Sequence, residues 1–212
     1  MNFNDHSNLV GQHAFLGASK FHWLNYDEET LIRTYKRQYA TTVGTILHEL
    51  ASDCIKNRIR LSKNADRHLI QLELIRNKIP TEFIDINSIL ETLVPFVNDA
   101  IGFGMTSELV LYYSENCFGT ADTLSFKNNF LRIHDYKSGT LPTHMEQLLI
   151  YAALFCLEYK IKPFDIEAEL RIYQGGEILY HRPQPEEIMD ICKKIIESDN
   201  IIAKINSRGV SA

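Results

Sequence analysis

The chain has 212 residues, a formal net charge of −5, 45% hydrophobic residues and 23% charged residues. This is the composition of an ordinary globular protein with enough apolar residues for a core, and the length suits one domain. No apolar run reaches the roughly 18 residues of a membrane span, and the polar segment 1–13 lacks a signal-peptide pattern. We therefore expect a soluble, cytoplasmic protein without membrane contact.

The negative net charge argues mildly against a nucleic-acid binder, because such proteins are usually basic. The charge is uneven, however: residues 56–78 contain seven lysines and arginines against two acidic residues, and Arg33, Lys36 and Arg37 form a second basic cluster. Both clusters can also be read as solvated helix faces, and this alternative stays open.

Apolar residues recur at helical spacing in the first half of the chain. The first forty residues predict irregular or weakly helical structure, and three helices are predicted after them, over residues 41–61, 66–78 and 86–103. Pro80 ends the second helix, and Gly102 and Gly104 end the third, which Pro95 kinks or starts.

The apolar pattern then changes from helical to alternating, which predicts strands over residues 107–114, 119–126 and 130–136. Asn128 and Asn129 tolerate positive φ and predict a two-residue hairpin turn. Residues 142–159 predict a helix with Pro142 at its start. Two strands follow, at 164–173 and 177–181, joined by a turn at Gly175-Gly176, and an amphipathic helix over 184–205 closes the chain.

This order of elements predicts an α/β fold with a central mixed sheet flanked by helices and with an N-terminal helical addition. We expect one domain over residues 1–212. Its parts are a mainly helical region, a sheet with a helix, and a C-terminal helix, over residues 1–105, 106–182 and 183–212.

The predicted hairpin places two carboxylates opposite one another. If Asn128 and Asn129 form the turn, Asp122 pairs with Asp135, and Lys137 lies two residues further along the same strand face. Two carboxylates in cross-strand contact repel each other, and a divalent cation such as Mg²⁺ or Mn²⁺ removes that repulsion. The alternative is a chance Asp–Asp pair with an ion-paired lysine on a surface hairpin.

Four motifs in the right order resemble the PD-(D/E)XK nuclease superfamily in its RecB-like branch. They are Gly44-Thr-Ile-Leu-His48, Gly119-Thr-Ala-Asp122, Asp135-Tyr-Lys-Ser-Gly139 and Gln147-Leu-Leu-Ile-Tyr151. The resemblance covers roughly residues 41–175 and implies the restriction-endonuclease-like core of that superfamily. A weaker match, Ala18-Ser-Lys-Phe-His-Trp23, resembles the serine-bearing opening of phage members.

The resemblance implies a role for each matched residue. Metal ligands would be His48, Asp122, Asp135 and the carbonyl of Tyr136. Asp122 and Asp135 would also be catalytic, with Lys137 as the catalytic lysine and Glu108 ordering a second metal or a water. Substrate would be bound by Gln147, Tyr151, Ser19 and Lys20. Ordinary structural roles stay open for His48 in the core, Tyr151 in the core, and Gln147 and Glu108 as unspecialised residues.

One or two Mg²⁺ or Mn²⁺ ions are the expected cofactors. No iron–sulfur cluster is expected, because Cys54, Cys117, Cys156 and Cys192 are widely spaced. His134 falls on the opposite strand face from the two aspartates and is left out of the site.

The expected activity is metal-dependent hydrolysis of DNA, by a stand-alone exonuclease of phage or bacterial recombination, repair or replication that acts on linear ends of single- or double-stranded DNA. The alternatives are a structure-specific or restriction-like endonuclease and a non-catalytic nucleic-acid binder of the same fold. A homo-oligomer and a recombination or replication partner protein stay open. The chain has no nucleotide-binding helicase motif, so a helicase would have to be another chain.

Overall fold

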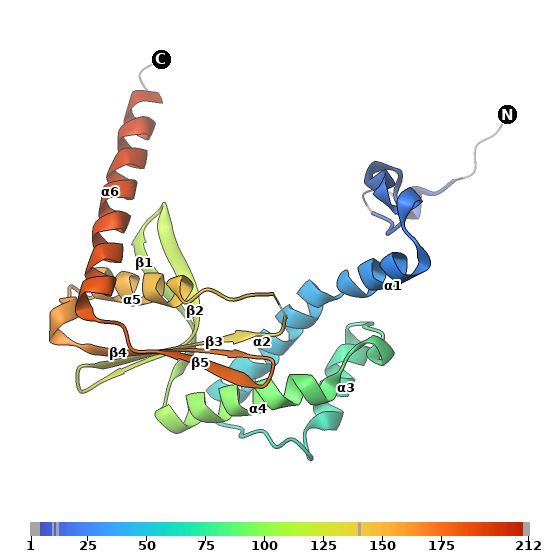
Figure 1. Ribbon diagram of the computed structural model, residues 1–212, viewed down its shortest axis with the longest axis horizontal. Helices are drawn as coiled ribbons and strands as arrows, with labels where there is room; N and C mark the ends of the chain where they lie inside the picture. Colours follow the sequence, from blue (N-terminus) through green and yellow to red (C-terminus); the bar gives the residue numbers. More distant parts are fainter. Residues whose placement is uncertain (1–4, 10, 12, 140, 210–212) are drawn as a thin grey trace. The chain divides into compact units, whose positions relative to one another are not determined.

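The computed structural model describes residues 5–9, 11, 13–139 and 141–209, with no side-chain description of residue 9 or beyond residue 206 (Figure 1). The chain divides into two compact units, Met1–Thr42 and Val43–Ala212, and each is described by itself. Of the helices in the described part of the chain, none is both long and apolar enough to cross a membrane.

The first unit contains two short 3₁₀ helices, η1 (Ser7–Leu9) and η2 (Ala18–Asn25), and one α-helix, α1 (Glu28–Arg37). Asp27 caps α1 by accepting a hydrogen bond from the Thr30 amide at 2.8 Å. Acidic residues in the first turn and basic residues in the last turn favour this helix through its dipole. The expectation of weakly helical structure understated α1, because its stability comes from capping and charge and none of its residues is buried.

A five-stranded mixed sheet with the strand order β1-β2-β3-β4-β5 forms the centre of the second unit. The strands are β1 (Thr106–Ser114), β2 (Cys117–Lys127), β3 (Phe130–Lys137), β4 (Glu167–Gln174) and β5 (Glu177–His181). Only β3 and β4 pair in parallel; the other three neighbouring pairs are antiparallel. A helix between β3 and β4 makes the crossover that a parallel pair requires.

Helices flank both faces of this sheet (Figure 1). The helices that follow α1 are α2 (Ala40–Lys56), α3 (Arg67–Arg76), which packs on α4, α4 (Ile86–Phe103), α5 (Glu146–Glu158) and α6 (Pro185–Gly209), with 3₁₀ turns η3 (Thr81–Phe83) and η4 (Pro163–Asp165). The α5 and α6 helices pack together over one face, and α4 packs against β3 and β4 on the other. An α/β fold with helices flanking a mixed sheet is therefore confirmed.

The main core fills the space between the sheet and the α5–α6 pair. Leu131 and Ile133 of β3 are fully buried there with Leu148 of α5. Residues of β3 with even numbers point the other way, where Tyr136 packs its ring on Phe96 of α4. The strand is covered on both faces, which fits the central position of β3 in the sheet.

The two-residue turn at Asn128 and Asn129 is confirmed. Both residues have positive φ, 52° and 59°, which is the conformation that a tight hairpin of this type requires. Its pairing runs from Lys127 with Phe130 to Thr123 with His134, in the predicted register.

Two predicted helix boundaries were wrong. The α2 helix ends at Lys56 because Arg58 adopts a positive φ of 56°, after which the Ile59 amide donates to the Cys54 carbonyl at 2.8 Å. The α5 helix begins at Glu146, so Pro142 does not start it. The Gln174 side chain holds the preceding segment by donating to the Gly139 and Leu141 carbonyls.

Candidate metal centre

The β2–β3 register brings Asp122 and Asp135 to the same place in the sheet. They are the next residues on each strand after the paired Thr123 and His134. Asp122 Oδ2 accepts a hydrogen bond of 2.8 Å from the backbone amide of Tyr136, which fixes this carboxylate against the end of β3. Asp135 is only 2% exposed.

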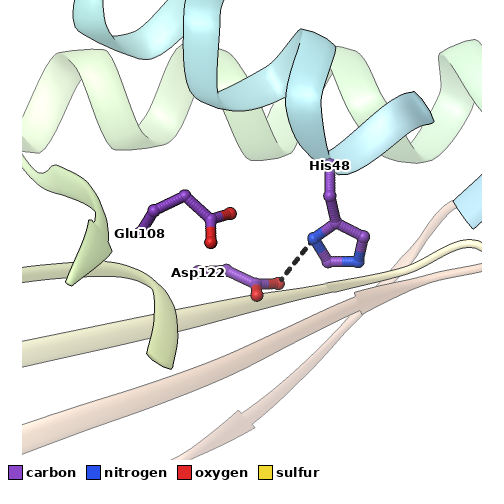
Figure 2. Close-up of side chains that lie close together, drawn as sticks. All are labelled: His48, Glu108 and Asp122. Carbon is purple, nitrogen blue, oxygen red and sulfur yellow. Dashed lines mark ion pairs between the residues drawn. The ribbon is translucent and has the colours of Figure 1, made fainter. Parts of the chain in front are cut away.

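Glu108 reaches the same place from β1. The pairs Ser107–Thr123 and Leu109–Ala121 flank Glu108 on one strand and Asp122 on the other, so these two residues lie opposite each other. Glu108 has a φ of 52°, a left-handed conformation that costs a residue with a Cβ about 1–2 kcal/mol. Such strained residues are found preferentially at functional sites. Figure 2 shows the Glu108 carboxylate directed toward Asp122 and His48.

His48 comes from α2, a helix held close to the sheet. The Ser52 and Ser107 hydroxyls lie 3.0 Å apart in a buried hydrogen bond between α2 and β1. One turn before His48, Gly44 allows a close approach, since a Cβ there would lie 3.0 Å from Ser138 Oγ. His48 Nδ1 lies 3.4 Å from Asp122 Oδ2, and the imidazole packs edge-on against the Tyr136 ring.

These three side chains form one compact group of potential ligands. One ligand atom each from His48, Glu108 and Asp122 lies within 4.8 Å of the other two. Opposite ligands on one octahedral Mg²⁺ are about 4.2 Å apart. The group is therefore near the spacing at which its members can share an ion.

A chain of polar contacts extends from Asp135 on the other side of Asp122. Lys137 Nζ lies 3.0 Å from Asp135 Oδ2 and donates to Gln147 Oε1 at 3.0 Å. Gln147 Nε2 in turn donates to the Tyr151 hydroxyl at 3.2 Å. Gly119 makes room for this arrangement, because a Cβ there would lie 3.0 Å from the Tyr151 ring.

The electrostatics of the group favour a bound cation. Burial raises the pKa of Asp122 and, together with repulsion from Asp122, the pKa of Asp135 well above the usual range of a carboxyl. The positive charge of Lys137 lowers the pKa of both aspartates, but by less than burial raises it. Burial lowers the pKa of His48, which keeps the imidazole neutral and able to act as a ligand.

Most of the predicted site residues lie together in the second unit. Glu108 belongs to the compact group of three potential ligands, with His48 and Asp122. Asp135 lies beside this group and contacts Lys137. The Tyr136 ring lies against the His48 imidazole at a centroid distance of 5.4 Å, and the role of the Tyr136 carbonyl as a metal ligand stays a prediction. Ser19 and Lys20 are exposed residues of η2 in the first unit, and their role in substrate binding stays a prediction.

Sequence reasoning missed Gln174, which supports the site from β4. Gln174 pairs with Lys137 in the parallel β3–β4 register, and its amide binds the two carbonyls that follow the Lys137-Ser138 segment. Knowledge of the parallel β3–β4 register would have identified Gln174, but no turn residue in the sequence determines that register.

His134 lies on the α4 face of the sheet, as predicted. Its side chain is fully buried between Phe103 and Tyr173, and burial beside Arg171 and Arg132 lowers its pKa to about 3. The neighbouring buried carboxylate is Glu169, which lies 2.9 Å from Arg171 and 3.5 Å from Arg132. This network belongs to the fold and faces away from Asp135.

Comparison of the chain with family models, curated proteins and solved structures gave no match.

Proposed function

We propose that this chain is a metal-dependent deoxyribonuclease with the PD-(D/E)XK fold of RecB-like nucleases. The observation that carries the proposal is the meeting of His48, Glu108 and Asp122 from a helix and two strands, with the Asp135–Lys137 pair beside them. Each of these residues is a motif residue or the acidic residue that the resemblance adds, and they come from distant segments of the chain.

The donor set fits a divalent ion. Carboxylate oxygens suit both Mg²⁺ and Mn²⁺, whereas a neutral imidazole favours Mn²⁺, which is a transition-metal ion. Asp135 Oδ2 is buried without a hydrogen bond of good geometry and lies 3.0 Å from Lys137 Nζ, so a bound cation would share this oxygen with the ammonium group. Asp122, Asp135, Glu108, His48 and the Tyr136 carbonyl would hold the metal. When bound, it would polarise a phosphodiester and lower the pKa of a water molecule.

The remaining residues would position and stabilise charge. Lys137 carries a positive charge next to the metal ligands, where negative charge grows on a phosphate during hydrolysis. Gln147 holds the ammonium group from the other side, so Lys137 has a fixed direction. Tyr151 extends this arrangement toward the surface of α5 and could hydrogen-bond to a phosphate.

An exonuclease acting on linear DNA is the form of this activity that we propose first, with an endonuclease as the alternative. The test is digestion of linear and covalently closed circular DNA of one sequence with Mn²⁺ or Mg²⁺. We expect degradation of the linear form, and none in EDTA. Cutting of closed circles at a similar rate would replace the exonuclease by an endonuclease.

Variants connect that activity to this site. Asp122→Asn and Lys137→Ala should each lower the rate by about 100-fold or more, since each removes charge stabilisation at the reacting phosphate. Lys193→Ala is the matched control, because it removes an exposed lysine of α6 whose ion pair is with Asp190, one helical turn earlier. Equal rates for all three variants and the parent chain would refute the proposal, and DNA binding without hydrolysis would favour a non-catalytic binder.

A further inference from the structure

The first unit contains a hollow of about 300 Å³ that the candidate metal centre does not use. All of its lining residues belong to this unit, from the segment before α1 and from α1 itself. They are Phe15, Lys20, Trp23, Tyr26, Thr34, Arg37 and Gln38.

Aromatic rings form the apolar part of the hollow. Phe15, Trp23 and Tyr26 are all half-buried. The Trp23 indole N–H donates to the Gly17 carbonyl at 3.1 Å, and the Phe15 ring packs edge-on against Tyr35 at a centroid distance of 5.1 Å. Two of the rings are thus fixed by their own contacts while part of their surface stays open to a ligand.

The polar part of the hollow is positively charged. Lys20 and Arg37 line it with exposed side chains, and its lining includes no aspartate or glutamate. The acidic residues of α1 lie in its first turn, and Arg37 is its last residue. The amide of Gln38 and the hydroxyl of Thr34 add hydrogen-bonding groups.

We propose that this hollow binds one unpaired nucleotide of a DNA strand, a substrate feature that rests on the proposed nuclease function. The rings would stack on the base, and Lys20 and Arg37 would bind its phosphate; this combination of aromatic platforms and cations is the usual one for single-stranded nucleic acid. The volume is at the lower limit for ligand pockets, which suits a single nucleotide and excludes a duplex.

Trp23 provides a direct readout, because it is the only tryptophan in the chain. Its fluorescence is to be measured in the full chain with EDTA, so that no hydrolysis occurs. The probes are thymidine monophosphate, thymidine and inorganic phosphate. We expect saturable quenching by the nucleotide, at least tenfold weaker binding of thymidine, and no quenching by phosphate alone.

Two variants separate the stacking from the charge. Arg37→Ala should weaken nucleotide binding about tenfold by removing a charged hydrogen-bond donor. Phe15→Leu keeps an apolar side chain but removes a ring, and should weaken binding at least fivefold. Arg33→Ala is the matched control: it lies one turn before Arg37 on α1, outside the hollow, and should leave the affinity unchanged.

Several results would overturn the inference. They are an absence of saturable quenching by the nucleotide, equal quenching by phosphate alone, or equal effects of the Arg33 and Arg37 substitutions in chains with unchanged circular dichroism. Metal-dependent DNA cleavage without nucleotide binding would reject this site and leave the nuclease proposal standing. Nucleotide binding without cleavage would do the reverse.

Discussion

Asp122 and Asp135 are acidic groups placed where burial and mutual repulsion disfavour their charged forms. The pKa of each is raised to about 6, so both bind protons as the pH falls from about 7 to 5. A divalent ion requires the ionised forms, and it therefore has to displace these protons. Protons would therefore compete with a metal ion at this site.

We predict that the affinity for Mn²⁺ rises at least tenfold between about pH 5 and pH 7, with protons released on binding. Titration calorimetry in two buffers with different ionisation enthalpies measures both quantities. Asp122→Asn should release fewer protons, since one titrating carboxyl is gone. Burial lowers the pKa of His48, so protonation of this imidazole competes with the metal less than protonation of an exposed histidine would. Binding that is independent of pH would contradict the prediction.

Glu169 holds the polar network on the opposite face of the sheet. Its side chain is 5% exposed and lies near Arg132 and Arg171, whose side chains are 25% and 19% exposed. We predict that Glu169→Ala lowers the free energy of unfolding by about 2–3 kcal/mol, because it removes the buried carboxylate that Arg132 and Arg171 share and leaves Arg171 with Asp99 alone. Urea denaturation measures the loss.

The control for Glu169 is its neighbour Glu167, which is exposed on the same strand. Glu167→Ala should change the free energy of unfolding by no more than about 0.5 kcal/mol. If the two substitutions cost the same, the buried network does not stabilise the fold.

At the scale of single residues, the sequence was informative where a turn fixed the geometry. The two asparagines of the β2–β3 hairpin determine the register, and the relation of Asp122 to Asp135 and Lys137 follows from it. The closeness of Glu108 to His48 could not be derived, because it depends on a positive φ at a glutamate, which the residue type does not signal.

At the scale of elements, the α5 helix packs closely on the β2 strand at Gly119, which has no side chain. Gly119 lies against the Tyr151 ring of α5, so an added methyl group must displace that ring by a few tenths of an ångström. Tyr151 is hydrogen-bonded to Gln147, which orients Lys137. The position of α5 on β2 is therefore coupled to the direction of the lysine.

We predict that Gly119→Ala lowers the rate of DNA hydrolysis about tenfold, because small displacements of positioning groups are costly. The effect should largely vanish in a Tyr151→Ala background, since the clash is then removed; a double-mutant cycle measures this coupling. Gly102→Ala is the control. It lies on the exposed face of α4, where a Cβ meets only ordinary contacts. If the effects of Gly119→Ala and Tyr151→Ala on the rate are additive, Gly119 does not act through its contact with the Tyr151 ring.

The order and type of the elements followed from apolar periodicity, whereas several of their ends did not. Three helices are followed by a basic residue with positive φ: α2 by Arg58, α3 by Lys78 and α5 by Lys160. This conformation is usually adopted by glycine, which makes a helix end easy to predict. The basic side chains are favourable near the carbonyl ends of helices, which offsets part of the strain. Helix ends of this kind leave no distinctive residue in the sequence.

At the scale of the whole molecule, the chain combines a negative net charge with basic residues in a few segments. The boundary between the two units lies after Thr42, inside the α2 helix, which runs from Ala40 to Lys56. No change of amino-acid composition marks this boundary in the sequence. All candidate metal ligands lie in the second unit, together with the main hydrophobic core. The nucleotide hollow lies in the first unit.

We predict that a shortened chain of residues 40–212, which keeps α2 whole, folds by itself and still binds Mn²⁺. Its core is complete: the sheet, α5 and α6 supply the buried cluster, and none of its members comes from the removed residues. Circular dichroism, cooperative thermal unfolding and calorimetry with Mn²⁺ test this prediction. The Mn²⁺ affinity should match that of the full chain, and the Asp122→Asn substitution should weaken binding by the same factor in both. If the shortened chain fails to unfold cooperatively, the first unit is needed for the fold. If it folds but binds no Mn²⁺, residues before α2 supply part of the metal centre.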